Sequence, residues 1–332
     1  MGKARVGQGA VVTTEWRRWI AERLLFGKGP QEICDHLVAR GISLKEAQRE
    51  VHTARTSPYL QASQNLHSRV TQQAWVLDSQ RRLNRMRDQV VPRRHRLSSE
   101  EFFREHYSVS RPVIVTGMME DWPALSKWNV DYFLANFSNR LVEVQGRRDS
   151  DPTYEIHKEE HREKMRFGDY VEWVRAVGQS NDRYMTAYTG GLNRTALAEL
   201  WFDLGPLAEY LRSGSGAHGN LWFGAGGTIT PFHYDNANNM MAQVMGTKRI
   251  LLIPASDGAR MYSGHRYFTE VDGRKLDYDR FPFMRDVTVS TVELAAGEIL
   301  FVPVGWWHFV ETLTTSAMVN FTNFLWPNDF PE

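Results

Sequence analysis

The second half of the chain has the pattern of a succession of short strands. From Asn220 to Phe324, runs rich in β-branched and aromatic residues are separated by turns that contain Gly, Pro, Asn or Asp. The clearest runs are 249–254, 287–294, 299–304 and 317–324. Many short strands with frequent turns are typical of a sandwich or a double-sheet jelly roll. The pattern therefore predicts a jelly-roll core, which is a double-stranded β-helix of two facing sheets.

The segment in front of this core mixes helices with a few strands. Strands are expected at 111–117, 141–145 and 183–188, and helices around 132–136 and 170–177. The sequence thus predicts a mainly β unit with flanking helices over 97–332.

One charge-dense part of that segment, residues 155–165, is also expected to be helical. It places His157 and His161 four residues apart on one helix face. That spacing could chelate a metal, but the neighbouring sequence offers no third ligand. A solvated helix is therefore the better interpretation.

Helical periodicity dominates residues 13–96. Apolar residues recur at spacings of three and four in three short segments between 14 and 55, and a longer helix is expected over 59–91. Residues 1–12 are small and Gly-rich, and are expected to be a disordered tail. A capped helix after Leu97 opens the second unit. We therefore predict a small all-α domain in front of the β unit, serving substrate recruitment or dimerisation.

The formal net charge of +1 conceals an asymmetry between these two parts. Residues 1–98 contain 18 Lys and Arg against 8 Asp and Glu, and the remainder contains 22 against 31. Much of the excess lies in one cluster, Arg81, Arg82, Arg85, Arg87, Arg93, Arg94 and Arg96. Such a cluster could bind nucleic-acid phosphates. We favour a basic face that contacts the acidic remainder of the chain or another subunit.

Cysteine content and apolar runs bear on the compartment. The single cysteine, Cys34, excludes an internal disulfide, as is usual in a reducing environment. The N-terminus lacks the apolar run of a signal peptide, and no apolar run approaches the 18 residues of a membrane span. These features predict a cytoplasmic protein.

Three residues of the β unit have the chemistry of a metal site. His233 and Asp235 lie two residues apart, so a strand would point both side chains to one face. His308 follows a buried run on a later strand and could supply a third ligand. Two histidines and one carboxylate leave coordination positions open, as in the facial triad that binds iron(II) in non-haem oxygenases.

A buried cation near such a metal would suit an anionic co-substrate. Lys248 follows a turn at Gly246, so a hairpin can return it to the metal strand. A charged lysine inside a barrel costs several kcal/mol unless an anion accompanies it. Thr230 could add a hydroxyl, but its parity differs from that of His233, so a break or bulge is expected at Pro231. Asn239 has the parity of the two metal ligands and could orient a chelating carboxylate.

Several motifs of the β unit occur together in one family. They are Thr230-Pro-x-His233-Tyr-Asp235, Gly246-x-Lys248-Arg249, Gly297-Glu-Ile-Leu-Phe-Val-Pro303, Trp306-Trp-His308 and Val319-Asn320-Phe321. Together they resemble the JmjC/cupin-8 family of Fe(II)- and 2-oxoglutarate-dependent dioxygenases, in particular its asparaginyl hydroxylases. The resemblance implies that 2-oxoglutarate is converted to succinate and CO₂ while O₂ hydroxylates a substrate C–H bond.

The resemblance also implies a role for each matching residue. The two histidines and the aspartate named above correspond to the iron ligands of the family. Lys248, Thr230 and Tyr184 correspond to the residues that bind the distal carboxylate of 2-oxoglutarate. Asn239 and Asn320 correspond to a polar pair near its chelating end.

Two departures from that pattern concern dimerisation and substrate. The asparaginyl hydroxylases dimerise through C-terminal helices that have no counterpart before Glu332, and Thr322 replaces an aromatic residue on the substrate side. The helical domain could instead form a homodimer.

The substrate remains open between several classes. A protein or peptide side chain is the leading hypothesis, with Tyr262, Arg266 and Tyr267 of the 256–286 loop lining a peptide groove. The alternatives are a tRNA-modifying hydroxylase recruited through the basic helices, and a small-molecule hydroxylase. Demethylation would need an N-methyl group held over the metal. A metal-binding scaffold without activity is disfavoured because the ligands and the co-substrate residues occur together.

Overall fold

The computed structural model describes residues 11–87, 89–186, 190–213, 219–264 and 267–330. The chain divides into two compact units, Met1–Gln80 and Arg81–Glu332. Each unit has its own buried cluster of apolar side chains.

The first unit is helical, as its periodicity predicts. It contains α1 (Thr14–Leu25), α2 (Pro30–Ala39), α3 (Leu44–Thr56) and most of α4 (Pro58–Arg85). The hydroxyl groups of Thr13 and Ser43 accept hydrogen bonds from Trp16 N and Glu46 N, and so cap α1 and α3. Apolar residues from all four helices, together with Val12 and Ile42, form the core. Of the predicted tail, residues 1–10 lie outside the described residues.

Helix α4 differs from the other three helices in its burial. Across its 28 residues, Leu60 is the one buried side chain. Four large apolar side chains are 46–85% exposed and follow one another at spacings of seven, four and seven residues: Tyr59, Leu66, Val70 and Leu77. These spacings place the four on one stripe of the helix surface.

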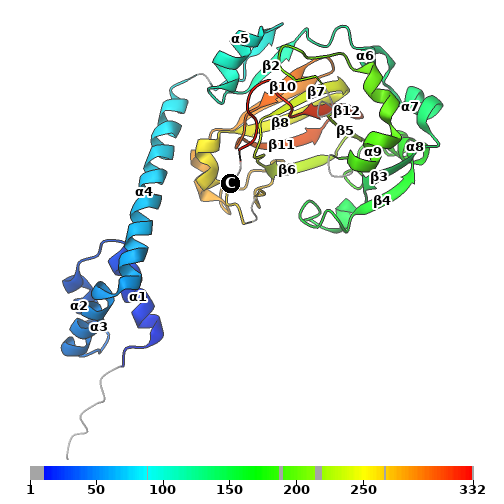
Figure 1. The fold of residues 1–332 in the computed structure, drawn as a ribbon. Helices are drawn as coiled ribbons and strands as arrows, with labels where there is room; N and C mark the ends of the chain where they lie inside the picture. Colours follow the sequence, from blue (N-terminus) through cyan, green and yellow to red (C-terminus); the bar gives the residue numbers. More distant parts are fainter. Residues whose placement is uncertain (1–10, 88, 187–189, 214–218, 265–266, 331–332) are drawn as a thin grey trace, which may run out of the picture. The chain divides into compact units, whose positions relative to one another are not determined.

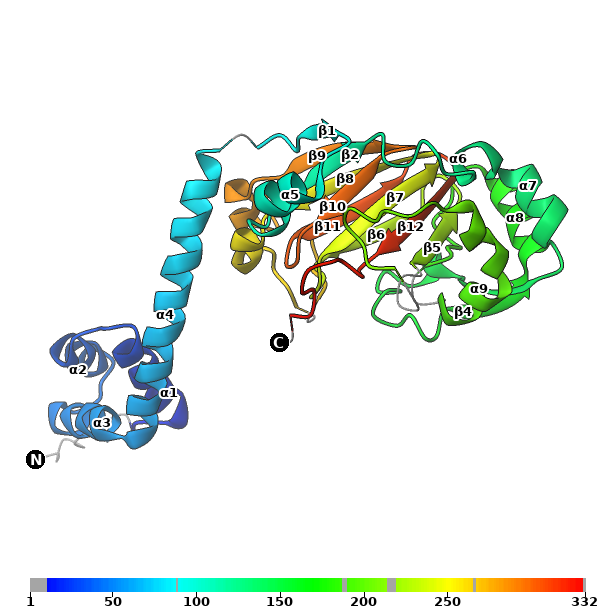
Figure 2. The same ribbon diagram turned by 45° about the horizontal axis from the view of Figure 1, so that its top comes forward.

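Two sheets form the core of the second unit (Figures 1 and 2). The larger sheet has the order β1 (Arg93–His95), β2 (Val113–Thr116), β10 (Ile299–Val302), β7 (Asn239–Met245), β12 (Ser316–Phe321) and β5 (Asn220–Gly224). The smaller sheet has the order β6 (Ile229–His233), β11 (Trp307–Thr312), β8 (Thr247–Ile253) and β9 (Ser290–Ala295). Successive strands such as β7 and β8 belong to different sheets, so the chain crosses repeatedly between them. This is the predicted double-stranded β-helix.

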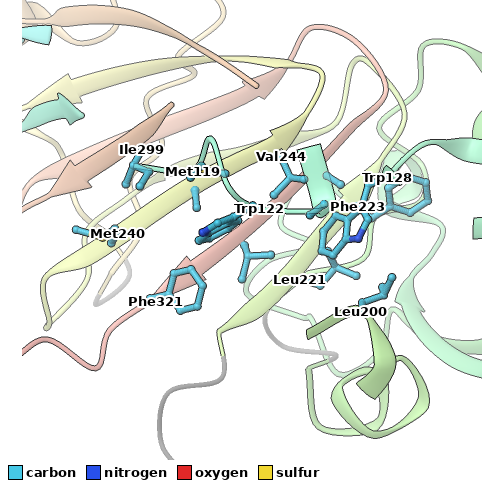
Figure 3. Close-up of a cluster of buried hydrophobic side chains, with 14 of the residues drawn as sticks. Met119, Trp122, Trp128, Leu200, Leu221, Phe223, Met240, Val244, Ile299 and Phe321 are labelled. Carbon is cyan, nitrogen blue, oxygen red and sulfur yellow. The ribbon is translucent and has the colours of Figure 1, made fainter. Parts of the chain in front are cut away.

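The larger sheet is covered on both faces, which explains its unbroken apolar runs. On β7, Met241 faces the smaller sheet, whereas Met240, Ala242 and Val244 belong to the cluster beneath the helices. Figure 3 shows part of that cluster, with Trp122, Trp128 and Phe223 among its large members. A sheet buried on both faces reads as continuous hydrophobic sequence rather than as alternation.

The flanking elements gather at the β5 end of the larger sheet (Figures 1 and 2). They are α6 (Ala124–Lys127), α7 (Val130–Phe137), α8 (Phe167–Val177), α9 (Gly190–Ala196) and a two-stranded sheet of β3 (Leu141–Gln145) and β4 (Arg162–Arg166). A short helix, α5 (Ser99–Phe102), follows β1 and has the predicted cap, a capping box on Ser98. The strand expected at 183–188 consists of two isolated bridges, at Tyr184 and Met185, and residues 187 and 188 lie outside the described residues.

The helix expected at 155–165 is wrong. Turns extend to His161, and Arg162–Arg166 forms β4, which pairs with β3. His157 and His161 both reach the carboxylate of Asp151, at 2.8 and 3.3 Å, instead of pointing into solvent from one helix face. Pairing with β3 and these side-chain hydrogen bonds outweigh the local helical preference of the charged residues.

Among the described residues, no helix has both the length and the apolar character needed to cross a membrane.

Candidate metal centre and co-substrate pocket

A bulge in β6 brings Thr230 and His233 to the same side of the strand. His233 lies opposite His308 of β11, and Thr230 lies opposite Val310, so three steps on β6 match two on β11. Both side chains line one cavity. Pro231 lies within this segment and has no N–H to donate to the ladder. The predicted break in parity is therefore confirmed.

His233, Asp235 and His308 form one compact group. Their ligand atoms all lie within 4.8 Å of one another. Asp235 Oδ1 is 4.0 Å from Nε2 of His233, and Oδ2 is 3.8 Å from Nε2 of His308. In the described part of the chain, this is the one group of three such side chains close enough to hold a metal.

Both imidazole rings are fixed by the backbone behind them. Nδ1 of His233 lies 2.8 Å from the carbonyl oxygen of Pro231, and Nδ1 of His308 lies 3.0 Å from that of Trp306. A carbonyl can only accept, so in each ring Nδ1 carries the proton and Nε2 keeps a free lone pair. Metal-binding histidines are commonly oriented in this way.

The environment of His308 fits a metal ligand. Its side chain is 1% exposed, and Nε2 has no hydrogen-bond partner among the described residues. Burial and the neighbouring His233 lower the pKa of His308 to about 4, so the ring stays neutral. A buried, neutral and unpartnered nitrogen beside a carboxylate is the donor set that a divalent metal requires.

A relay of amides orients the Asp235 carboxylate. Nδ2 of Asn239 donates to Asp235 Oδ2 at 3.1 Å, and Nδ2 of Asn320 donates to Oδ1 of Asn239 at 3.1 Å. At the far end, Nε1 of Trp222 donates to Oδ1 of Asn320 at 2.9 Å. The indole can only donate and the carboxylate can only accept, so both amides are fixed in direction. Trp222 is a part of the site that sequence reasoning missed.

Lys248 is fully buried at the other end of the site. Its Nζ donates to the hydroxyl of Tyr184 and to Oγ1 of Thr312, each at 2.8 Å, and its side chain is 0% exposed. Within the described ranges, no carboxylate lies at ion-pair distance from this ammonium group. Thr312 was also missed, although it shares the parity of His308 on β11 and so faces the same side.

These residues surround a cavity of about 230 Å³. All of the predicted site residues except Lys248 line it, and Lys248 reaches it through Tyr184. Met241, Val310 and Met318 supply apolar wall from the space between the sheets. Thr322 also lines the cavity.

The loop between β8 and β9 contacts the metal side of β6. The ring of Phe268 stacks on that of His233 at 5.7 Å, and Tyr267 accepts a backbone hydrogen bond from Tyr234. Tyr262 turns away and packs on Phe281, 5.1 Å between ring centroids. Of the predicted groove residues, Tyr267 is therefore near the site and Tyr262 is not, whereas Arg266 lies outside the described residues.

A second cavity, of about 600 Å³, lies on the opposite side of β6. Ile229 and Pro231 face it from β6, and Phe268 faces it from the loop. Its other wall includes the buried pair Arg148 and Glu155.

Comparison with known proteins places the second unit in a defined group. Residues 99–328 match the sequence profile of the Cupin-like domain. The chain is 32% identical over 246 residues to lysine-specific demethylase JMJ30 of Arabidopsis thaliana, covering 72% of this chain and 55% of that protein. It is 28% identical over 251 residues to lysine-specific demethylase 8 of Xenopus tropicalis (70% and 52% covered) and to Jumonji C domain-containing protein 5 of Drosophila melanogaster (70% and 59% covered). The chain spans about half the length of the curated relatives that it matches.

Proposed function

Because the chain belongs to the JmjC family with a cupin-like domain, we propose that it is a Fe(II)- and 2-oxoglutarate-dependent dioxygenase. It hydroxylates an amino-acid side chain of a protein or peptide and releases succinate and CO₂. O₂ and 2-oxoglutarate are the co-substrates.

The observation that carries this proposal is the buried Lys248 beside a three-ligand metal group. A charged lysine without an anion is costly in a protein interior. A dicarboxylate that reaches from the metal to Lys248 would supply the missing charge. Tyr184 and Thr230 line the same cavity and would add hydroxyl donors to its distal carboxylate.

His233, Asp235 and His308 would hold the iron, which when bound supplies open coordination positions for the keto acid and for O₂. The remaining residues position and desolvate the reactants. Asn239 and Asn320 keep the Asp235 carboxylate in one orientation. Met241, Val310 and Met318 exclude water from the cavity wall.

The substrate is proposed to be a protein because a long loop contacts the strand that carries His233. Phe268 and Tyr267 of that loop lie against β6, where an extended peptide could approach His233. The names of two relatives denote lysine demethylases, and removal of an N-methyl group also begins with hydroxylation of a carbon. We propose stable side-chain hydroxylation as the outcome here, with demethylation as the alternative.

Mass spectrometry tests this proposal directly. Peptide libraries incubated with the protein, Fe(II), 2-oxoglutarate and O₂ should contain members heavier by about 16 Da, with equivalent succinate. Release of formaldehyde from methylated peptides would indicate demethylation instead. If succinate forms neither in the presence nor in the absence of peptides, the protein is not a dioxygenase of this kind.

The arginine cluster supports a protein-contact role over tRNA. Arg93 pairs with Glu298, Arg94 with Glu105 and Arg96 with Glu120, and Arg85 donates to the backbone carbonyl of Asp286. Guanidinium groups already engaged by acidic residues are less available to phosphates. A gel shift of tRNA that weakens steeply with salt would reverse this preference.

The apolar stripe on α4 is proposed to bind a second copy of the chain. Its members, Tyr59, Leu66, Val70 and Leu77, follow coiled-coil-like spacing. The basic residues Arg81, Arg82 and Arg85 lie at one end of α4 and the opposite end is neutral, so an antiparallel pair would keep the arginines apart. Light scattering should give a dimer that Leu66→Glu with Val70→Glu converts to a monomer. A monomeric wild type would leave substrate recruitment as the proposed role of the helical unit.

A further inference from the structure

Arg148 is a second fully buried cation next to the proposed co-substrate site. Its side chain is 0% exposed and lies 4.1 Å from the ring centroid of Tyr154 and 5.2 Å from that of Tyr184, measured from Cζ. Tyr184 is the residue whose hydroxyl accepts from Lys248. We call Lys248, Tyr184 and Thr230, the proposed binders of the distal carboxylate, the carboxylate clamp. The guanidinium group of Arg148 therefore packs against the tyrosine of this clamp.

The same guanidinium group holds the start of β6. Nη2 of Arg148 donates to the carbonyl oxygen of Ile229 at 2.6 Å, and the hydroxyl of Tyr154 donates to that oxygen at 3.1 Å. Nη1 donates to Oδ1 of Asn181 at 3.0 Å, and this oxygen also accepts from the backbone N–H of Ile229 at 2.9 Å. Both backbone groups of Ile229 are thus fixed, directly before Thr230.

The ion pair between Arg148 and Glu155 is made through a single hydrogen bond. A guanidinium and a carboxylate usually meet through two parallel hydrogen bonds. Here Nη2 alone reaches Glu155 Oε1, at 3.0 Å, whereas Nε of Arg148 and Oε2 of Glu155 have no partner among the described residues. The guanidinium group is oriented toward the carbonyl oxygen of Ile229. It therefore makes one hydrogen bond to Glu155 instead of two.

We propose that Arg148 is a positioning residue for 2-oxoglutarate. It holds the Tyr184 ring and the Thr230 end of β6 in register, so that their hydroxyl groups meet the distal carboxylate together with Lys248. This inference rests on the proposed function. It predicts that Arg148 affects recognition of the distal carboxylate and leaves the metal group intact.

The test compares two keto acids on full-length protein loaded with Mn(II). Calorimetry measures binding of 2-oxoglutarate and of 2-oxobutyrate, which keeps the keto acid and lacks the distal carboxylate. Arg148→Lys keeps the charge but loses the planar fork, and should weaken 2-oxoglutarate about 10-fold, the cost of one charge-assisted hydrogen bond. Binding of 2-oxobutyrate and of Mn(II) should stay unchanged. Arg147→Lys, at the exposed neighbouring arginine, is the matched control.

Other outcomes separate the possible failures. If the wild type does not bind 2-oxoglutarate, the proposed function fails. If Arg148→Lys binds both keto acids as the wild type does, or loses both equally, the positioning role is overturned. Should this variant not fold, Arg148→Gln with Glu155→Gln removes the ion pair without leaving a lone buried charge. Unchanged selectivity in that double variant, or its failure to fold, would likewise show that Arg148 serves the fold alone.

Discussion

The two ends of the proposed site are built in opposite ways. At the metal end, Asp235 is 36% exposed, and the nitrogen of His308 that faces the group has no partner among the described residues. At the clamp end, Lys248 and Tyr184 are at most 1% exposed and are hydrogen-bonded to each other. The metal end is held from behind by backbone carbonyls and amides, whereas the clamp end is held by its own side chains.

This difference matches what each end has to do. A metal that exchanges ligands needs donor atoms that are oriented but uncommitted. A carboxylate is recognised strongly only where water is excluded and the cation cannot be solvated. One cavity therefore combines an accessible exchange site with a dry recognition site.

Removing a metal ligand should have the largest effect. Asp235→Ala should weaken metal binding by more than about 100-fold. Losing a residue that only hydrogen-bonds to a metal ligand typically costs about 10- to 100-fold, and Asp235 is itself a proposed ligand. Titration with Mn(II) measures this loss. Asp151→Ala is the matched control, because Asp151 also lies between two histidines, His157 and His161. An equal loss in the control would place the metal at Asp151.

Removing the buried ammonium should affect the clamp end alone. Lys248→Met keeps the apolar stem and should weaken 2-oxoglutarate by 2 kcal/mol or more, about 30-fold. The metal affinity should not change. Because a buried charge without an anion is removed, the ligand-free variant should melt at a higher temperature than the wild type. A lower melting temperature would mean that the Lys248 side chain stabilises the free protein, contrary to a buried charge without an anion.

Cutting the amide relay should affect the metal end more weakly. Asn320→Ala leaves Oδ1 of Asn239 without its donor and allows this amide to turn away from Asp235. We expect about 10-fold weaker metal binding, at the low end for an outer partner. Trp222→Phe removes the indole N–H together with the five-membered ring, but leaves the bond between Asn320 and Asn239, and should have a smaller effect. Unchanged metal binding in Asn320→Ala would show that Asp235 needs no orientation by amides.

The smallest effect is expected at Thr312. Thr312→Val removes the hydroxyl that accepts from Lys248 and from Thr228, with little change in shape. One neutral acceptor contributes about 1 kcal/mol, so 2-oxoglutarate should bind about 5-fold more weakly. A loss as large as that of Lys248→Met would mean that Thr312 contacts the co-substrate itself.

The sequence predicted the parts of the site that depend on local periodicity. The two-residue spacing of His233 and Asp235, and the parity conflict at Thr230, follow from the geometry of a strand. The helices of the first unit were likewise predicted from capping residues and from spacings of three and four. Such signals lie within a few residues of the feature that they specify.

Contacts between distant segments could not be read in this way. Trp222 meets Asn320 across 98 residues, and Arg148 meets Ile229 across 81. Neither has a local pattern that distinguishes it from an ordinary core tryptophan or surface arginine. The helix wrongly expected at 155–165 failed for the same reason, since β4 exists only through its pairing with β3.

The pairing of β6 with β11 also sets the time at which the site can exist. His308 follows His233 by 75 residues. At the speed of protein synthesis, about 5–20 residues per second, the second histidine leaves the ribosome roughly 4–15 s after the first. A nascent chain therefore has no complete metal group until β11 can pair with β6. Iron would therefore bind a finished pocket rather than a single open strand.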